Sequence, residues 1–71
     1  MSALAEESDV VRQLRFLVVD DTEDMRDLMV RLIERSGHVA EEAADGIEAT
    51  VALSAHRYDV MLLDLDAADV W

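Results

Sequence analysis

The chain has 71 residues, no cysteine and no proline, and a formal net charge of −11 at pH 7. This length allows at most one small domain, the lack of cysteine excludes disulfides and thiolate metal sites, and the acidic balance disfavours nucleic-acid binding. No stretch is apolar for long enough to span a bilayer, and the first residues lack a signal-peptide pattern, so we expect a cytoplasmic protein with no membrane segment.

The chain divides into a leader and one domain. Residues 1–14 carry weak signals and are expected to be a leader, either a short helix or disordered. Residues 15–71 form the predicted domain. It opens with a strand over residues 15–20, because four consecutive β-prone residues, Phe16 to Val19, precede two acids.

The clearest helical pattern covers residues 23–36. Its apolar residues recur at helical spacing and predict one buried stripe, made of Met25, Leu28, Met29, Leu32 and Ile33. Arg26 falls on the opposite, polar side. We expect Thr22 or Asp21 to cap the start of the helix, and Gly37 to end it in the left-handed conformation.

A short strand and a second helix are predicted next. Residues 38–43 mix apolar and acidic side chains, which is typical of an edge strand, and His38 at their start is expected to face solvent. Asp45 should cap a helix over residues 47–56. The expected inward face of that helix contains Ala49, Ala52 and Leu53, with Ile47 or Val51 beside them.

A third strand is predicted within residues 58–66, YDVMLLDLD, where a short apolar run indicates a strand buried on both faces. The alternation of strands and helices predicts a parallel α/β sheet of three strands in the order 2-1-3. That order brings Asp20, Asp21 and Asp64 together at one sheet edge, where open α/β sheets build their sites.

Clustered carboxylates repel one another unless a cation neutralises them. A ligand set made only of oxygen atoms suits a hard cation, and a few carboxylates with waters suit Mg²⁺ better than Ca²⁺. A carboxylate beside such an ion could act as a nucleophile toward phosphorus. The alternative is that these acids only end strands and cap helices, a description that Asp21 and Asp45 do fit.

The order and spacing of FLVVDD, a helix ending in SG, EEAADG and YDVMLLD resemble the receiver domain of two-component response regulators over residues 15–66. The resemblance implies a flavodoxin-like fold in which Asp64 accepts a phosphoryl group. It further implies that Mg²⁺ is bound directly by Asp21, through water by Asp20, and by the backbone carbonyl of Asp66. The implied partner is a histidine kinase or a phosphotransfer protein.

The sequence departs from the family after Asp66, where it reads AADVW instead of continuing into the second half of the fold. The family's lysine and its switch serine or threonine have no counterpart, and the sequence contains no lysine. We therefore expect a truncated (βα)2β sheet whose open third strand is completed in a homodimer. Val70 and Trp71 are the expected interface residues, with a frayed terminus as the alternative.

Three functions compete at this point. The first is a truncated receiver that binds Mg²⁺ and accepts phosphate on Asp64, which makes it a signalling module and not a turnover enzyme. The second is a phosphorylation-independent dimerisation or interaction module. The third is a phosphatase similar to the haloacid dehalogenase family, based on Asp64 and Asp66 as a DxD motif, although Ala68 stands where that family has Thr or Val.

Overall fold

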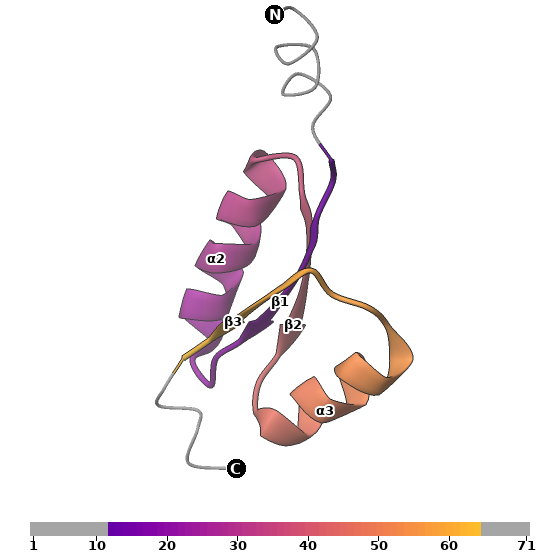
Figure 1. The fold of residues 1–71 in the computed structure, drawn as a ribbon. Helices are drawn as coiled ribbons and strands as arrows, with labels where there is room; N and C mark the ends of the chain where they lie inside the picture. The colour runs from indigo at the N-terminus through magenta and orange to yellow at the C-terminus, as the bar shows by residue number, and fades with distance from the viewer. Residues whose placement is uncertain (1–11, 65–71) are drawn as a thin grey trace, which may run out of the picture.

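The computed structural model describes residues 12–64 as one three-stranded parallel sheet with two helices (Figure 1). The strand order is β2-β1-β3, with both pairs parallel. The α/β class and the 2-1-3 order predicted from the sequence are therefore confirmed. The elements in chain order are β1 (Arg15–Val19), α2 (Glu23–Arg35), β2 (Val39–Ala43), α3 (Gly46–Ala55) and β3 (Val60–Leu63).

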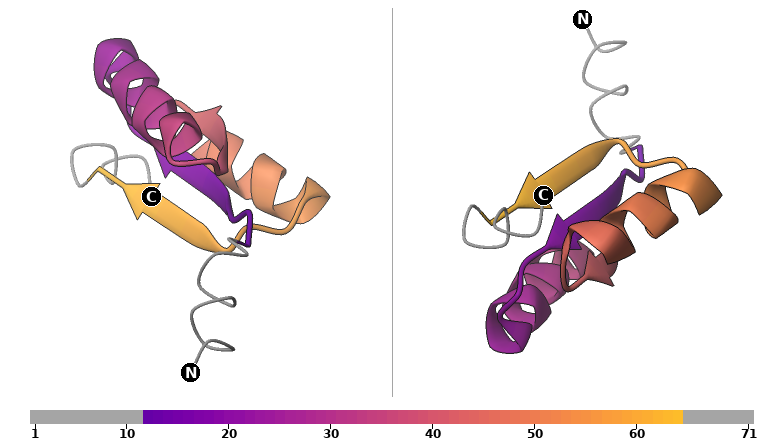
Figure 2. Two further views of the ribbon diagram at one scale, coloured as in Figure 1. Left: turned by 90° about the horizontal axis from the view of Figure 1, so that it is seen from above. Right: turned by 90° about the horizontal axis from the view of Figure 1, so that it is seen from below.

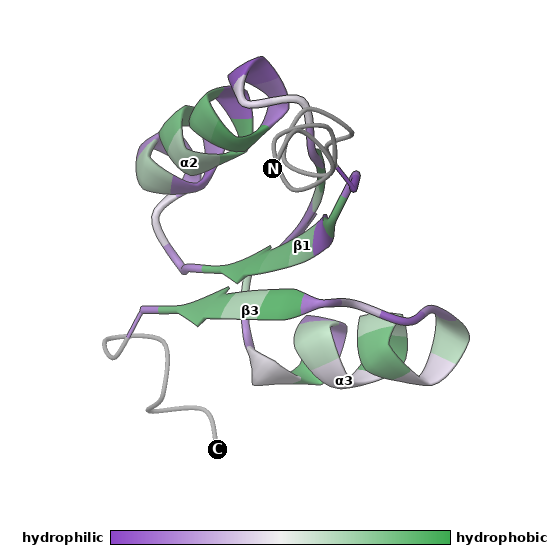
Figure 3. Cartoon of the chain, turned by 45° about the horizontal axis from the view of Figure 1, so that its top comes forward, coloured by the Kyte–Doolittle hydropathy of each residue, from purple (hydrophilic) through white to green (hydrophobic). Residues whose placement is uncertain are grey.

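The two helices cover opposite faces of the sheet, so the central strand β1 is buried on both sides (Figure 3). Under α3, Leu17 and Val19 of β1 pack with alanines of β2 and α3. Under α2, Val18 of β1 packs with Val30 and Ile33 of the helix. The alternation of Leu17, Val18 and Val19 between the faces follows from the two-residue period of a strand.

Helix α2 begins and ends nearly as expected. Thr22 occupies the N-cap position, but its side chain makes no capping hydrogen bond. The Thr22 N–H instead donates to Oδ1 of Asp20, at 2.8 Å. At the other end, Gly37 adopts φ +90°, the left-handed conformation that glycine reaches without a Cβ clash.

The predicted apolar stripe of α2 is only partly buried. Ile33 belongs to the core and Met29 packs against it, whereas Met25, Leu28 and Leu32 are 47–49% exposed. The reason is the placement of the helix, which packs over β2 and β1 and leaves the flank on the β3 side uncovered. Helical periodicity identified the apolar residues correctly but could not show how wide the sheet beneath them is.

Helix α3 starts with a reciprocal cap. The Asp45 carboxylate accepts from the Glu48 N–H, and the Glu48 carboxylate accepts from the Ala44 N–H, both at 2.8 Å. The first bond satisfies a backbone donor that a helix start leaves unpaired, and the second ties the residue before the N-cap to the first turn. The cap on Asp45 is confirmed.

The inward face of α3 is narrower than predicted. Ala49 is fully buried and Ala52 packs against the same core. Leu53, Ile47 and Val51 were expected on or beside that face, but all three are exposed. The residues of α3 that pack on the sheet are therefore small, and its larger apolar side chains are not part of this core.

His38 is not a solvated side chain. It is partly buried, its Nδ1 accepts a hydrogen bond from the Leu14 N–H at 3.0 Å, and its ring lies 5.6 Å from the ring of Phe16. The imidazole thus takes up a backbone donor just before β1, at the point where β2 begins. The prediction failed because nothing local in the sequence brings residues 14 and 38 together.

Strand β3 forms one border of the described sheet (Figure 2). Val60 and Leu62 are half-buried, but Met61 is 44% and Leu63 38% exposed, so the expected burial on both faces is wrong for this structure. Both helices pack mainly on β1 and β2, so β3 is covered less than the central strand. Within residues 12–64, no helix is long and apolar enough to cross a membrane.

Candidate functional site

Two acids stand where neighbouring strands end. Asp20 directly follows β1 and Asp64 directly follows β3. Val19 pairs with Leu63 in the parallel register, and the Asp64 N–H donates to the Val19 carbonyl at 2.9 Å. Asp20 and Asp64 therefore lie side by side at the carboxyl edge of the sheet.

Asp20 is held through both its backbone and its side chain. It is 8% exposed and is the only buried charged side chain in the described part of the chain. Its N–H donates to the Ala43 carbonyl at 3.1 Å, and its carboxylate accepts from the Thr22 N–H at 2.8 Å. These bonds fix both the backbone and the carboxylate, and they leave Asp20 positioned before any ligand arrives.

Arg26 holds the backbone beneath the site. Its Nη1 donates to the Asp20 carbonyl at 2.8 Å, and its Nε donates to Oε1 of Glu42 at 3.1 Å. The side chain therefore connects α2 to the end of β1 and to β2. The helical pattern had assigned Arg26 to the polar face, and its position in the first turn, just past the β1 acids, is the only signal that could have revealed this role.

Asp21 completes the cluster from the exposed side. It follows Asp20 in the turn before α2, and the Thr22 hydroxyl donates to its Oδ1 at 3.3 Å. Carboxylate oxygens of Asp20, Asp21 and Asp64 all lie within 4.8 Å of one another. The predicted convergence of these three residues is thus present, whereas Asp66 lies outside the described residues.

The chemistry of this donor set fits a hard divalent cation. All three donors are carboxylates, with no nitrogen or sulfur among them, and such oxygen ligands suit Mg²⁺ or Ca²⁺. The cluster borders a hollow of about 290 Å³ that reaches along β3 and the flank of α2. Asp20 and Asp64 line this hollow, so a reacting group can reach them from the β3 side.

Comparisons with known proteins agree with this geometry. The family description "Response regulator receiver domain" matches residues 16–71. The chain is 41% identical over 54 residues to a gliding motility regulatory protein of Myxococcus xanthus, covering 76% of this chain and 7% of that protein. It is 35% identical over 49 residues to the chemotaxis protein CheY of Halobacterium salinarum, covering 69% of this chain and 41% of that protein.

The chain thus spans less than half the length of either relative. No solved structure matches significantly. The family match covers most of the sequence and includes β3 and all but the first residue of β1. This chain belongs to the response regulator receiver domain family of two-component signalling.

Proposed function

We propose that this receiver domain binds Mg²⁺ at Asp20, Asp21 and Asp64 and accepts a phosphoryl group on Asp64. The observation that carries the proposal is the gathering of three carboxylates within 4.8 Å at the carboxyl ends of β1 and β3. The proposal includes the backbone carbonyl of Asp66 as a further ligand, although that residue lies outside the described part of the chain.

Each acid has a separate role in this proposal. Asp20, buried and anchored by the Thr22 N–H, orients the site and holds the metal through water. Asp21, exposed beside it, is a direct ligand. Asp64 acts as the nucleophile. A bound Mg²⁺ supplies positive charge that offsets the three carboxylates and lets an anionic phosphodonor approach.

The reaction is a transfer from a phosphohistidine of a histidine kinase or a phosphotransfer protein. An oxygen of the Asp64 carboxylate forms a bond to phosphorus while the bond from phosphorus to the histidine nitrogen breaks. The nitrogen keeps the electron pair and takes up a proton, and Asp64 becomes an acyl phosphate. In this role the protein is a signalling module and not an enzyme that turns over a substrate. We place it in the cytoplasm, together with the kinase or phosphotransfer protein that donates the phosphoryl group.

Intact-mass spectrometry with Mg²⁺ and acetyl phosphate tests this function. The chain should gain the mass of one phosphoryl group, and Asp64→Asn should gain none. Glu34→Gln removes an exposed acid in the last turn of α2 and should be modified like the natural sequence. No gain in any variant would overturn the proposal, and release of phosphate from a phosphomonoester would instead favour the phosphatase alternative.

A second candidate is a phosphorylation-independent association module. The observation that favours it is a group of exposed apolar side chains along the β3 border of the sheet. It consists of Met61 and Leu63 of β3 and Leu28 and Leu32 of α2. Self-association that is equal with and without Mg²⁺, and equal in Asp64→Asn, would support this candidate.

A further inference from the structure

Strand β3 has a backbone edge that no described strand occupies. The Asp64 N–H bonds to the Val19 carbonyl, so residue 64 directs its amide toward β1. Because successive residues of a strand direct their backbone groups to opposite sides, Leu62 also faces β1, and Met61 and Leu63 face the open edge. The strand therefore offers the N–H and C=O groups of Met61 and Leu63 to a further strand.

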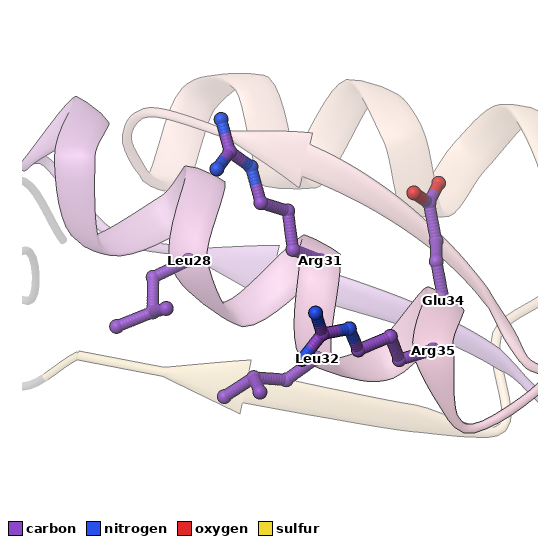
Figure 4. Close-up of a pocket in the computed structure, with 5 residues that line it drawn as sticks. All are labelled: Leu28, Arg31, Leu32, Glu34 and Arg35. Atoms are coloured by element: carbon purple, nitrogen blue, oxygen red, sulfur yellow. The ribbon is translucent and has the colours of Figure 1, made fainter.

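The same border is apolar on both faces of the sheet. Met61 and Leu63 are 44% and 38% exposed on the face that α3 covers elsewhere. On the other face, Leu28 and Leu32 point in one direction from α2, with Arg35 beside Leu32 (Figure 4). An exposed strand edge bordered by apolar side chains on both faces is a surface suited to strand pairing.

Charges are distributed so that a second copy fits this border. The acids Asp20, Asp21 and Asp64 lie at the carboxyl end of the strands. At the opposite end arginines outnumber acids: Arg12, Arg15, Arg35 and Arg57 lie there with Glu34 and Asp59. A parallel neighbour would set acids against acids, whereas an antiparallel neighbour sets the acidic end of one copy against the arginine end of the other.

We propose that two copies pair their β3 strands antiparallel about a twofold axis that passes beside Leu62. Met61 of each copy then exchanges both backbone hydrogen bonds with Leu63 of the other, which uses every outward-facing backbone group of Val60–Leu63. A register centred on Met61 would leave Leu63 without a strand partner. The proposal rests on the association module named above and gives its partner and register.

The resulting interface is self-complementary, as a twofold contact requires. On one face the exposed Met61 and Leu63 side chains of both copies pack into one cluster. On the other face the two Leu62 side chains meet between the α2 helices, whose Leu28 and Leu32 flank them. The two three-stranded sheets become one six-stranded sheet in which β3 is no longer at an edge.

Leu62→Cys tests the register directly, because the natural sequence contains no cysteine. Directly opposed residues that share no hydrogen bond have Cα atoms about 4.5 Å apart, which is within the range for a disulfide. Mild oxidation should convert most of the Leu62→Cys chain to a covalent dimer. The control, Val51→Cys, is 63% exposed on α3, away from the border, and should stay largely monomeric on a non-reducing gel.

Light scattering of the 71-residue chain supplies a readout that does not depend on the cysteine variant folding. The natural chain should run as a dimer at micromolar concentration, and Leu63→Lys should raise the dissociation constant at least tenfold. Val51→Lys should leave that constant unchanged. A folded natural monomer overturns the proposal, and so does a dimer in which Leu62→Cys folds but cross-links no faster than Val51→Cys. The latter result keeps the association module and rejects only this register.

Discussion

Replacing Asp21 with asparagine should stabilise the protein when no divalent cation is present. The carboxylates of Asp20, Asp21 and Asp64 lie within 4.8 Å of one another. Two unit charges at that separation repel by about 1 kcal/mol in water and by about 3.5 kcal/mol at an effective dielectric constant of 20. Asp21 is exposed, so the lower value applies, and its repulsion by two neighbours amounts to about 2 kcal/mol.

The substitution preserves the local hydrogen bond. An asparagine side chain keeps an oxygen that can accept from the Thr22 hydroxyl, as Oδ1 of Asp21 does. For a domain of this size, about 2 kcal/mol corresponds to a rise in Tm of roughly 10 °C. Thermal unfolding followed by circular dichroism, in EDTA at low ionic strength, measures this rise. Added salt should shrink the difference, because the charges at the mouth of the site are screened.

The control is Glu34→Gln, which removes one negative charge from an exposed position in α2 that lies outside the cluster. It measures the gain in stability that follows from removing any one negative charge, because a chain of net charge −11 repels itself in the folded state. If Asp21→Asn is no more stable than Glu34→Gln in EDTA, the reasoning about the cluster is refuted. With Mg²⁺ the order should reverse, because ligand binding stabilises only the chain that retains the site.

Three further predictions concern the fold. Asp45→Ala should lower the free energy of unfolding by about 1 kcal/mol, measured with urea, because the Glu48 N–H loses its cap; an unchanged midpoint would contradict this. Gly37→Ala should cost about 1 kcal/mol through the φ of +90° alone, since nothing lies within 4 Å of an added Cβ; an equally stable variant would argue against the left-handed turn. Burial, and then the hydrogen bond to Glu41, raise the pKa of Tyr58, the only tyrosine, above 10.0, so its phenolate absorbance should appear only at higher pH, and earlier in Glu41→Gln. Because the native pKa is raised, the stability contributed by the neutral phenol is present below pH 10.0 and is lost as the pH rises through the native pKa; a midpoint at or below 10.0 would contradict the assignment.

The arrangement of the acids could be predicted from the sequence because it depends on local patterns. The apolar run before Asp20 and the one before Asp64 each specify a strand. The alternation with helices then fixes parallel pairing and the order β2-β1-β3. Since parallel strands end at one edge, the proximity of Asp20 and Asp64 follows without any knowledge of their side-chain contacts.

Contacts between distant segments could not be predicted. The bond from Leu14 to His38 and the link from Arg26 to Glu42 join residues that no periodic pattern connects. The exposure of Leu28 was missed for a related reason: periodicity shows which side of a helix is apolar, but not how far the sheet beneath it extends. The division into a leader over residues 1–14 and a domain over residues 15–71 stays a prediction, as do the placements of Val70 and Trp71, which lie outside the described residues.

The measurement that tests the central claim most directly is a calorimetric titration of the 71-residue chain with Mg²⁺, alongside Asp64→Asn and Glu34→Gln. We predict one bound ion for the natural chain and for Glu34→Gln, and binding at least tenfold weaker for Asp64→Asn. That result would show that the ends of β1 and β3 build a metal site, as the geometry of Asp20, Asp21 and Asp64 indicates. Equal binding by all three proteins, or no binding by any of them, would contradict the account.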